Sequence, residues 1–194
     1  MSPLAALIGG EFRLNALRTA SNEGRAGIVT PPGWGFMVDN EEATTASFNL
    51  PDNVECLVYI GGGMADNLSG SHGNDVLVGA AGVDVLSGGA GADQFPYNGG
   101  EIGVDQILDF TPGTDKIALA LPTIDYAGFT RMASTALVQG AGANAATSAE
   151  STFIYDSTTG LLSYDADGSL VGGLIALATL QPGLTLSLTD FIFV

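Results

Sequence analysis

An all-β fold built around a coil of parallel strands is predicted by three features of residues 61–96: a nine-residue period, one aspartate per period and one apolar residue per period. A fixed period over several blocks is typical of repeat proteins. The blocks align as G-x-x-G-x-D-x-U-x, where U is apolar, and Met64 alone departs from the second glycine. The four blocks are GGGMADNLS (61–69), GSHGNDVLV (70–78), GAAGVDVLS (79–87) and GGAGADQFP (88–96).

Each block divides into a six-residue turn and a three-residue strand. Glycine tolerates the tight bends and positive φ angles that such a turn needs. In a three-residue strand only the middle side chain can point inward, because side chains alternate between the two faces. Two blocks complete one coil of eighteen residues, so every second strand stacks in parallel on the same wall. The predicted core residues are Leu68, Leu77, Leu86 and Phe95.

The same stacking brings aspartates together in pairs, Asp66 with Asp84 and Asp75 with Asp93. Two close carboxylates repel each other, and a divalent cation between them relieves the repulsion. Calcium prefers six to eight hard oxygen ligands in a flexible shell, whereas magnesium requires a tighter octahedron. We therefore expect two calcium sites, the first weakened if the position of Met64 needs the backbone freedom of glycine. The glycines expected to lend turn backbone to these sites are Gly61, Gly63, Gly70, Gly73, Gly79, Gly82, Gly88 and Gly91.

The amino-acid composition restricts which partners the chain is expected to bind and where it is expected to be located. Five basic residues oppose 21 acidic ones, which gives a formal charge of −16. Such a chain is an improbable partner for nucleic acid or anionic membranes, and its self-repulsion favours cation binding. With 46% hydrophobic residues it can still build a core. The single Cys56 has no disulfide or metal-ligand companion. No transmembrane run and no basic n-region of a cleaved signal peptide are present in the sequence.

The flanking regions suggest three segments. Residues 1–50 read as an irregular or short-strand N-terminal segment, residues 51–118 as the repeat coil, and residues 119–194 as a β-rich C-terminal cap. Within this segment, residues 52–60 fit the nine-residue phase as a degenerate capping coil, since terminal repeats are usually atypical. The residues expected to continue the core after the fourth block are Ile107, Phe110, Ile117 and Leu119.

Three acidic residues after the fourth block, Glu101, Asp105 and Asp109, are candidates for one more calcium site. They fit solvated turn carboxylates equally well. Further on, FIYD (153–156) and LLSYD (161–165) are expected to pair as a hairpin through a Ser-Thr-Thr-Gly turn. The following Asp-Ala-Asp-Gly (165–168) resembles the opening of a calcium loop but lacks its distal glutamate, so a simple turn is favoured.

The four nonapeptides, the following VDQILDFTPGTDKIAL, the YDADG turn and the terminal DFIFV resemble the RTX family. Members of this family are bacterial proteins exported by type I secretion, and residues 50–194 resemble the C-terminal part of serralysin-type proteases. The resemblance implies a parallel β-roll with calcium between stacked turns. It also implies an uncleaved export signal in roughly the last 50 residues, with Asp190–Val194 at its tip, a type I exporter as partner and an extracellular destination.

Calcium-coupled folding would suit such export. Three-residue strands with one core side chain each bury little apolar surface, so metal binding has to supply folding free energy. Extracellular calcium modules typically bind at about 10⁻⁴ to 10⁻³ M. We therefore expect the coil to be unfolded in the cytosol and to fold outside.

Catalysis is not expected. The zinc helix HExxH of serralysin-type proteases and the G-x-S-x-G elbow of lipases are missing from the sequence. The single histidine, His72, falls in a repeat turn expected to face solvent. Two non-catalytic functions remain open. The chain is either a secreted calcium-binding module whose roll drives folding and export, or a polysaccharide-binding accessory module of a secreted polymer-acting enzyme.

Overall fold

The computed structural model of the chain describes residues 36–39, 47–49, 57–61, 63–97, 103–119, 135–166, 168 and 174–194. In these ranges the regular elements are β-strands, apart from one 3₁₀ turn, η1 (Leu188–Asp190). No helix within the described ranges is long and apolar enough to cross a membrane. The predicted all-β class is therefore confirmed.

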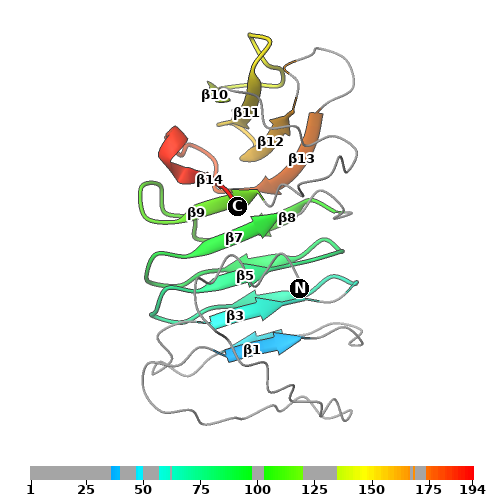
Figure 1. Cartoon of the computed structure of the whole chain (residues 1–194), viewed down its shortest axis with the longest axis vertical. Helices are drawn as coiled ribbons and strands as arrows, with labels where there is room; N and C mark the ends of the chain where they lie inside the picture. The colour runs from blue at the N-terminus through cyan, green and yellow to red at the C-terminus, as the bar shows by residue number, and fades with distance from the viewer. Residues whose placement is uncertain are drawn as a thin grey trace.

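Strands from alternate turns of the coil form two mainly parallel sheets. The first sheet runs in the order β1 (Phe36–Asp39), β3 (Leu57–Ile60), β5 (Val76–Val78), β7 (Gln94–Tyr97), β9 (Lys116–Leu119) and β14 (Phe191–Phe193). Figure 1 shows these strands stacked along the long axis of the molecule. The second sheet runs in the order β10 (Thr135–Gly140), β11 (Ser151–Asp156), β12 (Leu161–Asp165), β13 (Leu174–Thr179), β8 (Asp105–Ile107), β6 (Val85–Ser87), β4 (Asn67–Ser69) and β2 (Ser47–Asn49).

The register follows the predicted coil of eighteen residues. In the second sheet Leu68 pairs with Leu86, and in the first sheet Tyr59 pairs with Leu77. All strand pairs among β1 to β9 are parallel. The parallel β-roll is thus the fold of this region, and two adjacent blocks make one coil.

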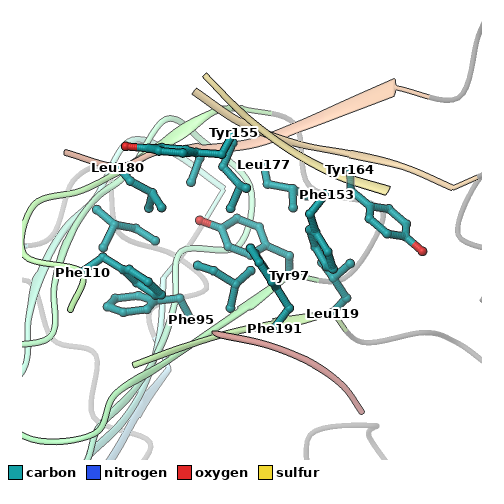
Figure 2. Close-up of a cluster of buried hydrophobic side chains, with 14 of the residues drawn as sticks. Phe95, Tyr97, Phe110, Leu119, Phe153, Tyr155, Tyr164, Leu177, Leu180 and Phe191 are labelled. Carbon is teal, nitrogen blue, oxygen red and sulfur yellow. The ribbon is translucent and has the colours of Figure 1, made fainter. Parts of the chain in front are cut away.

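The core lies between the two sheets. Each strand of the four repeats buries the side chain at its second position, as predicted: Leu68, Leu77, Leu86 and Phe95 are at most 1% exposed. The expected continuation of the core is also confirmed, because Ile107, Phe110, Ile117 and Leu119 are buried. One apolar cluster therefore runs through the coil into the C-terminal cap, where aromatic side chains enlarge it (Figure 2).

The C-terminal strands extend both sheets of the roll. Strands β11 and β12 form the expected antiparallel hairpin, and its turn ends at Gly160, which has a φ of 81°. Strand β13 then adds to β8 in the second sheet, and the terminal strand β14 adds to β9 in the first. The cap therefore closes the end of the coil (Figure 1).

Two local expectations about the cap have clear outcomes. The Asp165 carboxylate accepts a hydrogen bond from Gly168 N at 2.9 Å, which closes the simple turn that was favoured there. The segment borders at residues 50 and 118 stay predictions, although strands β1 and β2 already belong to the two sheets. Cys56 lies outside the described residues.

Candidate metal centre

Aspartates stack along the two turn edges of the roll, as the period predicts. The main-chain N–H of Asp66 donates to Asp84 Oδ1 at 2.7 Å, and that of Asp75 donates to Asp93 Oδ1 at 2.8 Å. Both contacts span eighteen residues. Each wall of the roll therefore carries its own ladder of aspartates, one per coil.

A second backbone hydrogen bond accompanies each of these contacts. The residue after the upper aspartate donates to the carbonyl of the lower one, as in Val85 N to Asp66 O and Gln94 N to Asp75 O, both at 2.8 Å. The two bonds fix the height and the rotation of one turn relative to the next. The aspartate side chains are consequently held by the same ladder that forms the sheets.

Each ladder has a third member beyond the four blocks. Asp84 N donates to Asp105 Oδ1 at 3.0 Å across 21 residues, and Asp93 N donates to Asp115 Oδ1 at 3.1 Å across 22 residues. Asp105 had been predicted as a candidate ligand, whereas Asp115 had not. A sequence signal for Asp115 does exist, because it stands two residues before a buried apolar residue, Ile117, like every repeat aspartate.

The stacked carboxylates are buried and incompletely satisfied. All six ladder aspartates are at most 3% exposed. Asp84 Oδ2 and Asp93 Oδ2 are buried oxygens without a hydrogen-bond partner among the described residues. Leaving a buried charged oxygen unpaired is costly, and such exceptions often mark an ion-binding position. These two oxygens therefore indicate where a cation is required.

The electrostatics of the ladders favour a cation as well. Burial raises the pKa of Asp93 to about 7, the hydrogen bond from Asp75 N opposes this, and the charges of Asp115, Asp75 and Asp109 raise it further. Burial likewise raises the pKa of Asp84 to about 6, with the hydrogen bond from Asp66 N opposing and the charges of Asp105 and Asp66 adding to the rise. Without a counterion the charged form of each ladder is thus disfavoured.

The first glycine of each block makes room for these carboxylates. A Cβ on Gly61 would lie 2.8 Å from Asp66 Oδ2, and one on Gly70 would lie 2.5 Å from Asp75 Oδ2. The same clash recurs between Gly79 and Asp84 Oδ2 and between Gly88 and Asp93 Oδ2. Glycine at this position therefore lets the carboxylate of its own block pack directly against the main chain of the turn.

Backbone carbonyls lie close to the same glycines. A Cβ on Gly61 would also meet Gly79 O, and a Cβ on Gly70 would meet Gly88 O. Within the described residues no three acidic, histidine or cysteine side chains converge on one point, so side chains alone do not complete a metal shell. Carboxylate and carbonyl oxygens together are hard ligands of the kind that calcium prefers. The residues present therefore fit calcium.

The fourth position of each block explains why Met64 is tolerated. A Cβ on Gly82 would lie 2.5 Å from Met64 O in the turn below, and Gly91 meets Gly73 O in the same way. Gly82 and Gly91 also have positive φ, whereas Ala80 is the single described non-glycine residue that does. Met64 is 53% exposed and does not have a positive φ. Its backbone therefore does not need glycine.

The remaining predicted residues have different positions. The Asp109 carboxylate accepts bonds from Ser87 Oγ at 2.6 Å and from Gly88 N and Gly89 N at 2.9 Å each. Asp109 thus anchors the turn of the fourth block. Asp105 instead belongs to the ladder of Asp66 and Asp84. Glu101 lies outside the described residues. His72 is exposed, as expected.

A coil of parallel strands with carboxylate ladders in glycine turns defines a metal-binding repeat protein. Residues 60–95 match the family model of the RTX calcium-binding nonapeptide repeat in four copies, so this part of the chain is a calcium-binding repeat module. No curated protein matches the chain significantly. The narrower likeness to serralysin-type proteases stays a prediction.

Proposed function

We propose that the chain is a non-enzymatic, secreted calcium-binding module whose β-roll folds when it binds calcium after type I export. The observation that carries the proposal is a pair of buried oxygens, Asp84 Oδ2 and Asp93 Oδ2, which have no hydrogen-bond partner within the part of the chain that the structure describes. In this proposal one calcium is held between the turns of Asp66 and Asp84 and another between those of Asp75 and Asp93. Carbonyls of the stacked turns, such as Gly79 O and Gly88 O, complete the two shells.

Folding is coupled to the metal for a physical reason. Strands β4 and β6 each bury one leucine fully, and ordering nine residues per block costs conformational entropy that this burial does not offset alone. The like charges of the ladders add a further cost. A ligand that binds the folded state and not the unfolded chain stabilises it by mass action. Calcium supplies the missing free energy and removes the repulsion together.

The difference in calcium concentration across the cell envelope determines on which side the chain folds. Extracellular calcium modules bind at about 10⁻⁴ to 10⁻³ M, far above cytosolic calcium. The chain therefore stays unfolded and threadable inside the cell. It folds outside, and folding opposes its return.

Circular dichroism in the far ultraviolet during a calcium titration tests metal-driven folding, with magnesium as the ion control. We expect a gain of β signal near millimolar calcium and no comparable gain with magnesium. The variant Asp75→Ala/Asp84→Ala should lose the response. Asp156→Ala removes a half-buried hairpin carboxylate that belongs to neither ladder, and this variant should keep the response. A full β signal in metal-free buffer would contradict the proposal.

Export is tested separately in a bacterium that carries a type I exporter. The intact chain should accumulate in the medium only when the exporter is present. A chain without residues 190–194 should remain in the cells. Equal amounts in the medium with and without the exporter would contradict this part of the proposal.

A further inference from the structure

The outer face of the first sheet carries a line of apolar residues. Side chains alternate between the two faces of a strand, so the residue that follows each core residue points away from the core. On strands β5, β7, β9 and β14 these residues are Val78, Pro96, Ala118 and Ile192. Pro96 pairs with Ala118 and Ala118 pairs with Ile192, so they occupy the same place on neighbouring strands. We call these four residues the outer apolar line.

The outer apolar line is buried, although it faces away from the core. Val78 is 3% exposed, Ala118 is 0% exposed and Pro96 is buried as well. The second sheet differs at the same place, where Ser87 is half-buried and Leu108 is 47% exposed. One outer face of the roll is therefore covered along this line, whereas the other remains partly exposed.

The described strands do not supply this cover. All of them belong to the two sheets, and the second sheet packs on the opposite side, across the core. The described repeat turns lie at the edges of the sheets, where they connect one sheet to the other (Figure 1). The structure contains one copy of the chain. The cover therefore comes from a segment of the same chain other than these strands and turns.

Residues 1–35 are long enough and suitably placed to reach this face. They lead directly into β1, which belongs to the same sheet. The outer apolar line begins on β5, two strand spacings or about 10 Å from β1. A segment of this length spans about 115 Å when fully extended, which is far more than it needs. It also contains the apolar runs LAALI (4–8) and AGIV (26–29), which suit an apolar surface.

The charge of residues 1–35 is complementary to that of the rest of the chain. They carry three basic and two acidic residues, a net charge of +1, whereas residues 36–194 carry two basic and 19 acidic ones, a net charge of −17. Opposite charges attract the two parts and favour their contact. Residues 120–134, which follow β9 of the first sheet, carry one basic and one acidic residue and hence no net charge. Charge thus favours residues 1–35 as the cover.

We infer that the outer apolar line is a docking surface for residues 1–35 of the same chain. The inference goes beyond the proposed function, because it concerns the surface of the folded roll and not the ion that drives folding. Docking covers Val78 and Ala118, which would otherwise belong to an exposed apolar patch. The line exists only when β5, β7 and β9 are paired, so the segment docks only after the roll has folded.

The single lysine of the chain, Lys116, lies on the same outer face and allows a direct test. It precedes the core residue Ile117 and pairs with Gln94 of the neighbouring strand, and its side chain is half-buried. A photoreactive crosslinker is attached to this amine in the full chain, folded in millimolar calcium. Mass spectrometry of the digested protein should find crosslinks from Lys116 to residues 1–35. In Lys116→Arg these crosslinks should be absent.

The variant Val78→Ser tests whether the outer apolar line holds the segment. Serine occupies the equivalent place on the second sheet, as Ser69 and Ser87, so the variant is expected to keep the roll. The yield of crosslinks from Lys116 to residues 1–35 should fall several-fold. Val85→Ser, on the outer face of the second sheet, is the matched control and should keep the wild-type yield.

Three outcomes would overturn the inference. Crosslinks from Lys116 to residues 120–134 or to a second copy of the chain would mean that a different segment covers the face. Crosslinks confined to the neighbouring strands would mean that nothing docks there. Equal yields in Val78→Ser and Val85→Ser would mean that the outer apolar line does not hold the segment. The wild-type crosslinks decide between the occupants even if a variant does not fold, which circular dichroism would show.

Discussion

The main-chain N–H of Asp66 donates a hydrogen bond of 2.7 Å to Oδ1 of Asp84, and Asp84 repeats this contact with Asp105 one coil further on. Asp84 therefore contacts the aspartates of the turns on both sides of it, whereas the structure describes such a contact of Asp66 with one neighbouring turn. We therefore expect calcium binding to be more sensitive to substitution of Asp84 than to substitution of Asp66.

Replacing the inner aspartate is expected to weaken calcium binding more than replacing the outer one. Asp84→Asn removes a charge that lies close to the charges of both Asp66 and Asp105, whereas Asp66→Asn removes a charge from the end of the described ladder. Because bonds to charged groups contribute about 1.5–3 kcal/mol, the calcium midpoint of the β signal should rise about tenfold or more in Asp84→Asn. Asp66→Asn should shift the midpoint less. Equal shifts in a side-by-side titration would argue against the shared position of Asp84.

The calcium-free roll is expected to gain stability as the pH falls. The pKa of Asp93 is raised from its ordinary value of 3.8 to about 7 in the folded state, so this group favours folding at low pH. That contribution is complete below about pH 4 and is lost as the pH rises through about 7. Circular dichroism in metal-free buffer should thus show more β structure at pH 5 than at pH 8.

The variant Asp93→Asn provides the control for this pH dependence. It removes the group whose pKa is raised most, so the difference between pH 5 and pH 8 should shrink. The Asp84 carboxyl, with a pKa of about 6, should account for part of what remains. A β signal that grows from pH 5 to pH 8 would contradict the electrostatic picture of the ladders.

The roll could be predicted from the sequence because each block repeats the same pattern of residues. One apolar residue and one aspartate per nine residues predicted the core of Leu68, Leu77, Leu86 and Phe95 and the pairing of Asp66 with Asp84. All of these contacts are set by the period itself. Whether the ladders bind calcium as proposed stays a prediction.

The parts that were missed depend on insertions and on distant pairing. Extra residues after the fourth block break the ninefold spacing, because Asp105 and Asp115 lie 21 and 22 residues from the aspartates on which they stack, so Asp115 went unnoticed. The additions of β13 to β8 and of β14 to β9 join strands whose short apolar sequences carry no register signal. The terminal residues predicted to be the tip of an export signal thus also form a strand of the fold.

Ala80 offers a stabilising substitution. It has a φ of 65°, in the left-handed region that costs a non-glycine residue about 1–2 kcal/mol. Ala80→Gly removes this strain, and the greater freedom of glycine in the unfolded chain offsets part of the gain. We expect a net gain of up to about 1 kcal/mol, seen as a lower calcium midpoint in the same titration.

The equivalent position in the next block supplies the opposite control. Gly89 has a φ of 90°, and a Cβ there would clash with Ser71 O of the turn below. Gly89→Ala should therefore raise the calcium midpoint or prevent folding. A rise of the midpoint in Ala80→Gly would show that the left-handed conformation at this position is not the limiting cost.

Gly103 is expected to be indispensable for the turn that leads into Asp105. A Cβ at this position would overlap Gly82 O in the turn below, and backbone atoms on both sides cannot move aside without breaking the ladder. Gly103→Ala should therefore lower the thermal midpoint of the calcium-loaded protein by several degrees or more. Gly63→Ala is the matched control, because a Cβ there meets nothing within 4 Å. Equal midpoints for the two variants would contradict the close stacking of Gly103 on Gly82.

The terminal strand is expected to depend on Phe191. Its ring stacks on Phe153 with centroids 3.8 Å apart, and its side chain is 7% exposed. Phe191→Ala removes this contact from the core, and such changes cost about 3–5 kcal/mol. Hydrogen exchange of the amides from Ile192 to Val194 should then accelerate in the calcium-loaded protein, because β14 loses its anchor to the cap. Leu188→Ala, at a residue that is 48% exposed, should leave exchange nearly unchanged. Unaltered protection in Phe191→Ala would mean that the bonds between β14 and β9 hold the strand without the aromatic contact.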